Sequence, residues 1–156
     1  MAHPEIRLAR ILVPTDFSAD AELAYPWAHS MSHAFKAEVI FLHVIDQDVT
    51  ALTPMSMPPM PSAEEEIMER VRLEAMDLLS RLSTEFPQAR TLIRDGAPRA
   101  MIVDVASETD AHLIVMGTHG RTGLAHAAFG SVAEYVIQHS KVPVLAIRRV
   151  HIKPPR

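Results

Sequence analysis

Short apolar runs alternate with segments of helical periodicity along most of the chain. The first run, residues 11–13, stops at Pro14, and a longer run, residues 39–45, is rich in β-branched residues. Strands buried on both faces have this nearly continuous apolar composition, which is typical of parallel sheets. Shorter runs predict three further strands, at residues 91–93, 113–116 and 142–147.

Four segments between these strands show helical periodicity. The first follows Ser18, a favourable N-cap residue, and extends to about Phe35. Pro26 lies inside it and is expected to kink or break the helix, with a tolerated kink favoured. The other three helices are predicted at residues 63–86, 99–107 and 131–139. In the second of the four, a stripe at helical spacing comprises Ile67, Val71, Ala75, Leu78, Leu79 and Leu82.

This alternation predicts one α/β domain with a parallel sheet and helices on both faces. We assign residues 1–150 to the domain and residues 151–156 to a short basic tail. The connection over residues 46–62 is rich in proline and methionine. We interpret it as a surface loop, and a binding lid is the less favoured alternative.

The composition excludes several classes of protein. The 156 residues carry a formal net charge of −4, which argues against charge-driven binding to nucleic acids or membranes. The absence of cysteine excludes a disulfide scaffold and thiolate metal sites. The histidines form no close ligand cluster along the sequence, so no dedicated metal site is predicted. No apolar stretch reaches the length of a membrane span, and we expect a cytoplasmic location.

Candidate chemistry concentrates in one glycine-rich segment directly after the fourth predicted strand. Four of the five glycines lie in this segment: Gly117, Gly120, Gly123 and Gly130. Ser131, directly after the last of them, begins the next predicted helix. Ligands of open parallel sheets bind at the carboxyl ends of strands, and glycine lets the backbone approach a ligand closely. Successive N–H groups of such a turn, and of a helix N-terminus, bind anions. The segment therefore predicts a phosphate site, although any single glycine could serve only the turn or the helix cap.

Common nucleotide motifs are absent from the sequence. It has no GxxxxGK(S/T) loop, and no GxGxxG follows the first strand. Gly117, Gly120, Gly130 and Ser131 instead match the G-2x-G-9x-G-(S/T) signature of ATP-binding universal stress proteins. Four other segments resemble that family: ILVPTDFS (11–18), LHVI (42–45), DGAP (95–98) and VPVLAI (142–147). The resemblance extends from Arg10 to Arg148.

This resemblance implies a Rossmann-like single domain with strand order 3-2-1-4-5. It also implies that the ligand is ATP or a related adenine nucleotide, and that Mg²⁺ arrives with the nucleotide. It assigns Pro14, Thr15 and Asp16 to the adenine and ribose end and the backbone of Val44 to the adenine edge. Met116 and Gly117 would flank the ribose. The phosphate contacts would come mostly from backbone N–H groups of Gly120, Arg121, Gly130, Ser131 and Val132.

The residues themselves leave alternatives open. Asp16 could cap the following turn, Val44 could be a core residue only, and Arg121 could be a solvated loop residue. Ala133 stands where the family often has Thr or Ser, which weakens the prediction of tight metal–phosphate coordination. For His43, His119 and His126 we expect a hydrogen-bonded or solvated imidazole rather than an acid–base role.

The resemblance also implies a regulatory stress-response module that forms a homodimer, often through antiparallel pairing of the last strand, from Val142 to Ile147. An unpaired last strand would leave an exposed sheet edge. A slow ATP hydrolase, or an enzyme that phosphorylates itself at Ser131 or Thr122, is the first alternative. A dimeric interaction module without nucleotide function is the second.

Overall fold

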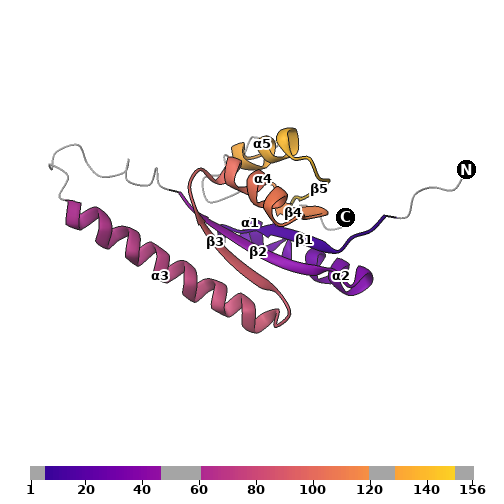
Figure 1. Ribbon diagram of the computed structural model, residues 1–156, viewed down its shortest axis with the longest axis horizontal. Coiled ribbons are helices and arrows are strands. Elements are labelled where there is room, and N and C mark those ends of the chain that lie inside the picture. The colour runs from indigo at the N-terminus through magenta and orange to yellow at the C-terminus, as the bar shows by residue number, and fades with distance from the viewer. Residues whose placement is uncertain (1–5, 47–60, 120–128, 150–156) are drawn as a thin grey trace, which may run out of the picture.

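The computed structural model describes residues 6–46, 61–119 and 129–149. Its sheet has five strands, all parallel, in the order β3-β2-β1-β4-β5, as predicted (Figure 1). Their bounds are β1 Arg10–Pro14, β2 Glu38–Ile45, β3 Arg90–Asp95, β4 Leu113–Gly117 and β5 Val144–Ile147. The described chain is thus a single-domain α/β fold with β1 at the centre of the sheet.

Helices cover both faces of this sheet. Helices α2 (Tyr25–Phe35) and α3 (Pro61–Glu85) lie on one face, with the short helix α1 (Ala19–Glu22) leading into α2. Helices α4 (Pro98–Glu108) and α5 (Ser131–His139) pack on the other face (Figure 1). Helix α5 has the predicted bounds, and α4 is one residue longer at each end than predicted.

The region predicted as one helix from Ser18 to about Phe35 is two helices, so the favoured kink at Pro26 is wrong. Helix α1 ends at Glu22, and α2 begins at Tyr25 with Pro26 in its first two positions. A helix accepts proline there because the missing N–H would have no partner within the helix. Ser18 caps α1 as predicted, and its Oγ accepts a hydrogen bond from the Ala21 N–H at 3.2 Å.

Other boundaries differ from the prediction by a few residues, chiefly at prolines. Pro14 was predicted to stop the first strand, but it is the last residue of β1. Strand β5 begins at Val144, after Pro143. Helix α3 begins at Pro61, inside the predicted loop, because proline is favourable at a first helical position. The rest of that loop, residues 47–60, lies outside the described residues.

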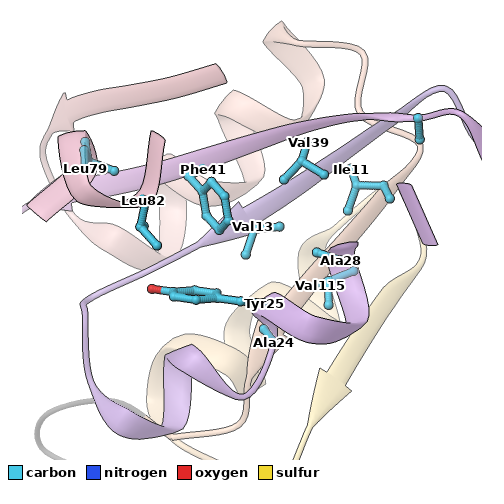
Figure 2. Close-up of a cluster of buried hydrophobic side chains, with 11 residues drawn as sticks. Ile11, Val13, Ala24, Tyr25, Ala28, Val39, Phe41, Leu79, Leu82 and Val115 are labelled. Carbon is cyan, nitrogen blue, oxygen red and sulfur yellow. The ribbon is translucent and has the colours of Figure 1, made fainter. Parts of the chain in front are cut away.

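Alternate residues of the central strands build two cores. Ile11, Val13 and Phe41 face α2 and α3, where Tyr25 and Leu82 join them (Figure 2). Leu12, Ile40 and Leu42 face α4 and α5. Strands β1 and β2 are therefore buried on both faces, which is the physical reason for their nearly continuous apolar sequence.

The apolar stripe of α3 is buried only in part. Ala75, Leu79 and Leu82 are buried, but Ile67 is 43% exposed. The N-terminal part of α3 runs out past the edge of the sheet in Figure 1. Within the part of the chain that the structure describes, no helix is long and apolar enough to cross a membrane.

Candidate functional site

The predicted site residues that the structure describes lie at the carboxyl ends of β1, β2 and β4 and at the N-terminus of α5. The chain runs from β1 outward to β2 and β3, then returns across the sheet to β4 on the other side of β1. The connections on the two sides of β1 therefore lie on opposite faces of the sheet. The crevice beside such a switch point is where open α/β sheets bind ligands.

Thr15 fixes the start of the loop that follows β1. Its N–H donates to the Leu42 carbonyl at 2.8 Å, which extends the pairing of β1 with β2 by one residue. Its Oγ1 lies 2.5 Å from the Tyr25 hydroxyl and accepts a hydrogen bond from the Phe17 N–H at 2.9 Å. Thr15 is only 5% exposed, so its side chain holds the loop and is not accessible to a ligand.

Asp16 is half-buried and caps the turn that leads into α1. Its Oδ1 accepts a hydrogen bond from the Ser18 N–H at 3.0 Å. Asp16 therefore has the turn-capping role that the sequence left open as an alternative. It does not exclude ligand contact, because a carboxylate has two oxygens and several acceptor positions.

Phe17 has a φ of 58°, a left-handed conformation that is uncommon for a residue other than glycine. Its ring lies against the His43 ring, with 4.7 Å between centroids. The His43 Nδ1 is 2.8 Å from the Thr15 carbonyl oxygen, and since a carbonyl only accepts, Nδ1 carries the proton. The prediction of a hydrogen-bonded imidazole at His43 is confirmed, and the loop after β1 is held at both Thr15 and Phe17.

Tyr25 is the anchor that the sequence reasoning missed. Burial raises the pKa of its phenol to about 12, against an opposing effect of the hydrogen bond with Thr15. The carboxylates of Glu22, Asp16 and Glu85 raise it further. A buried tyrosine hydroxyl usually has a partner, so an apolar position occupied by Tyr rather than Phe was the available signal.

Gly117, at the end of β4, is glycine for a packing reason. A Cβ on this residue would lie 2.4 Å from the carbonyl oxygen of Asp20 and 2.8 Å from its carbonyl carbon. The backbone of α1 thus passes directly over the end of β4. Met116 is 5% exposed, and its side chain packs in the core beneath α4 and α5. The Met116 side chain is therefore not available to a ligand and Gly117 has none, so contact with a ribose could come only from the backbone.

The two ends of the glycine-rich segment are joined to each other. The Gly130 N–H donates to the Thr118 carbonyl at 2.7 Å, and the Thr118 N–H donates to the Ile147 carbonyl at 3.0 Å. The His119 Nδ1 is 2.9 Å from the Thr118 Oγ1, which confirms a hydrogen-bonded imidazole there. Gly120, Arg121 and His126 lie outside the described residues, so their predicted roles stay predictions.

The N-terminus of α5 points its first amides toward this junction. Gly130 is the N-cap residue and, having no side chain, provides no capping hydrogen bond. Ser131 is exposed and Val132 is half-buried. Ala133 is 3% exposed and belongs to the core beneath α4 and α5. Its small side chain therefore fits a packing position, and the hydroxyl that the family often has there would point toward the core.

Val44 places the backbone of β2 beside this end of the sheet. The pairing of β1 with β2 ends at Pro14 and Leu42, so Val44 extends two residues beyond the end of β1. Gly96 closes the neighbouring turn: its N–H donates to the Ile45 carbonyl at 3.0 Å, and its φ of 139° requires glycine. In the parts of the chain that are described, no three His, Asp or Glu side chains converge as ligands for a metal ion.

Comparison with known proteins gives a consistent result. Residues 8–148 match the Universal stress protein family. Universal stress protein MJ0577 of Methanocaldococcus jannaschii is 33% identical over 153 residues, which cover 90% of this chain and 94% of the relative. The solved structure of MJ0577 has a TM-score of 0.78 at 32% identity and covers 94% of this chain and 100% of its own.

Two other solved structures share the fold. Universal stress protein UspA from Lactobacillus plantarum has a TM-score of 0.80 at 27% identity and covers 92% of this chain and 100% of its own. A universal stress protein in complex with cAMP has a TM-score of 0.58 at 24% identity, covers 89% of this chain and 95% of its own, and shows the shared fold alone. The family match, the relatives and the fold agree: the chain belongs to the universal stress protein family.

Proposed function

We propose that this chain binds ATP or a related adenine nucleotide at the carboxyl ends of β1, β2 and β4, as a regulatory module of the stress response. The observation that carries the proposal is the junction at the end of β4. There a G-2x-G-9x-G-S segment is closed by the Gly130–Thr118 hydrogen bond directly before the N-terminus of a nine-residue helix.

The junction suits a polyphosphate for two physical reasons. The first N–H groups of a helix have no partner within the helix, and the helix dipole adds partial positive charge there. Gly130 offers no side-chain acceptor to these amides. A phosphate oxygen at this position would accept hydrogen bonds from Ser131 and Val132, and Gly120 and Arg121 would add contacts from the rest of the segment.

The opposite end of the site suits the nucleoside. Asp16 keeps acceptor capacity for ribose hydroxyls or the adenine amine, and Val44 offers backbone groups to the base edge. Both sit on parts of the fold that are already fixed, Asp16 by the Thr15 and Ser18 hydrogen bonds and Val44 by pairing with β3. A preformed base end reduces the ordering cost of binding.

Calorimetric titration tests the proposal directly. Purified protein is titrated with ATP, ADP, AMP, cAMP and GTP, with and without Mg²⁺. We expect saturable binding of at least one adenine nucleotide below the millimolar range and weaker binding of GTP. No binding at millimolar concentration would contradict the proposal, and steady release of phosphate from ATP would favour the enzymatic alternative.

We further propose that the chain is a homodimer that pairs β5 with its copy. The Pro143 and Ile147 carbonyls accept hydrogen bonds from β4 and from the residue that follows it. Backbone groups of successive residues in a strand alternate in direction, so Val144 and Ala146 direct their N–H groups away from β4. Ala146→Pro therefore removes an outward donor and keeps the bonds to β4. Light scattering should show a dimer for the wild type and a monomer for Ala146→Pro, with an unchanged circular dichroism spectrum in both. A wild-type monomer would contradict this proposal.

A further inference from the structure

A separate candidate site lies on the face of the sheet that α2 and α3 cover. A cavity of about 730 Å³ opens between α2 and the C-terminal half of α3. This volume is in the range of small-molecule sites in proteins. Phe17 belongs to its wall, and the remaining lining comes from α1, α2, α3 and the residue that follows α3.

Aromatic and aliphatic side chains form part of the lining of this cavity. The rings of Tyr25 and Phe86 meet edge to face with 6.2 Å between centroids, and Leu78 and Leu82 lie on the side of α3. In Figure 2 the ring of Tyr25 lies beneath Phe41 and Val13, so its position is set by the core. Its hydroxyl is engaged with Thr15, which leaves the ring rather than the oxygen to face a ligand.

Two carboxylates from different helices stand at the cavity, Glu22 at the end of α1 and Glu85 at the end of α3. Among the described residues, neither forms an ion pair. Arg81 and His29 also line the cavity. The Arg81 guanidinium is already paired with Asp77 at 2.8 Å, and Asp77 does not line the cavity. The charge facing the cavity is therefore negative, and both carboxylates act on the Tyr25 phenol.

We propose that this cavity binds a small organic cation that carries one aromatic ring, such as an arylalkylammonium ion. The ring would pack against Phe17, Tyr25 and Phe86, which favour edge-to-face and offset contacts. The ammonium group would lie between Glu22 and Glu85, with additional attraction from the aromatic faces. The same negative charge disfavours phosphates, so the cavity is chemically distinct from the proposed nucleotide site.

A charge series on one ring tests the proposal. The probes are 2-phenylethylamine, 2-phenylethanol and phenylacetate, and binding is followed by backbone amide chemical shifts in NMR titrations. We expect the amine to bind about fivefold to tenfold more tightly than the alcohol, and the anion to bind most weakly, since each exposed carboxylate contributes about twofold to fivefold. Shifts should concentrate on α1, α2 and the C-terminal half of α3.

Two variants and one matched control assign the effect. Glu22→Gln and Glu85→Gln should each weaken the amine about twofold to fivefold and leave the alcohol unchanged. Glu74→Gln on α3 removes an exposed carboxylate that does not line the cavity, and should change neither. Equal binding of all three probes, no binding of any, or a loss of amine binding in saturating ATP would each overturn the proposal. Because the amine is titrated without nucleotide, failure of the nucleotide proposal leaves this test intact.

Discussion

The loop after β1 is anchored mainly by side chains, whereas the segment after β4 is anchored by its backbone. Thr15, Asp16 and Tyr25 hold the first through hydroxyl and carboxylate groups. The second depends on the close passage of α1 over Gly117 and on the Gly130–Thr118 hydrogen bond. Side-chain anchors can be removed one at a time, but a close backbone contact tolerates no added atom. The two loops should therefore respond differently to substitution.

The backbone anchor should give the largest effect. Gly117→Ala places a methyl group 2.4 Å from the Asp20 carbonyl oxygen, which forces α1 away from β4. We expect the free energy of unfolding to fall by about 3 kcal/mol in urea titrations followed by circular dichroism. Gly130→Ala is the matched control, because its φ of −72° and ψ of 157° suit alanine. Gly130→Ala should lower the free energy of unfolding by about 1 kcal/mol or less, because alanine is a poorer N-cap residue than glycine. Equal losses in Gly117→Ala and Gly130→Ala would contradict the proposed difference between the two glycines.

The side-chain anchor at Tyr25 should show in the pH dependence of stability. Its pKa is about 12 in the folded protein, against 10.0 for an unperturbed tyrosine, so the folded state keeps the proton longer. The resulting stability is fully present below pH 10 and is lost as the pH rises from 10 to 12.

We expect this loss to amount to about 2 kcal/mol, less than the full shift implies because the phenolate would keep some contact with water. Tyr25→Phe has no phenol to titrate and serves as the reference at each pH. The measured quantity is the difference between the unfolding free energies of the two proteins, which should shrink over this range. A difference that does not change with pH would show that Tyr25 titrates normally.

Asp16 tests whether a side-chain anchor also serves the ligand. Asp16→Asn keeps an oxygen that can accept from the Ser18 N–H but removes the charge and part of the acceptor capacity. We expect ATP affinity to fall about fivefold to tenfold, with little change in unfolding free energy. A hydrogen bond to a charged acceptor contributes about 1.5–3 kcal/mol, and the neutral amide keeps roughly half of it. Unchanged ATP affinity in both Asp16→Asn and Asp16→Ala, with a loss of stability in Asp16→Ala alone, would reduce Asp16 to a turn cap.

Most of the fold could be predicted from the sequence, because the strands are separate apolar runs of the kind that is buried on both faces of a parallel sheet. The prediction failed at two prolines, because proline breaks a helix in its interior but is favourable in its first turn. Pro61 is the first residue of α3, and Pro26 follows Tyr25 at the start of α2. At the site, motif spacing located the segment but not the reason for Gly117, which depends on a contact with Asp20 that only the folded chain brings together. Tyr25 was missed for the same reason.

The smallest expected effect separates backbone from side chain at Ser131, the first residue of α5. Ser131→Ala removes the hydroxyl and keeps the N–H, whereas Ser131→Pro removes both. Proline is well tolerated at a first helical position, and Gly130 already has the extended conformation that a residue before proline favours. If backbone amides hold the phosphates, ATP affinity should fall about fivefold in Ser131→Pro and twofold or less in Ser131→Ala. Equal losses would assign the contact to the hydroxyl. Both variants should unfold at similar urea concentrations, because the N–H that proline lacks has no partner within the helix.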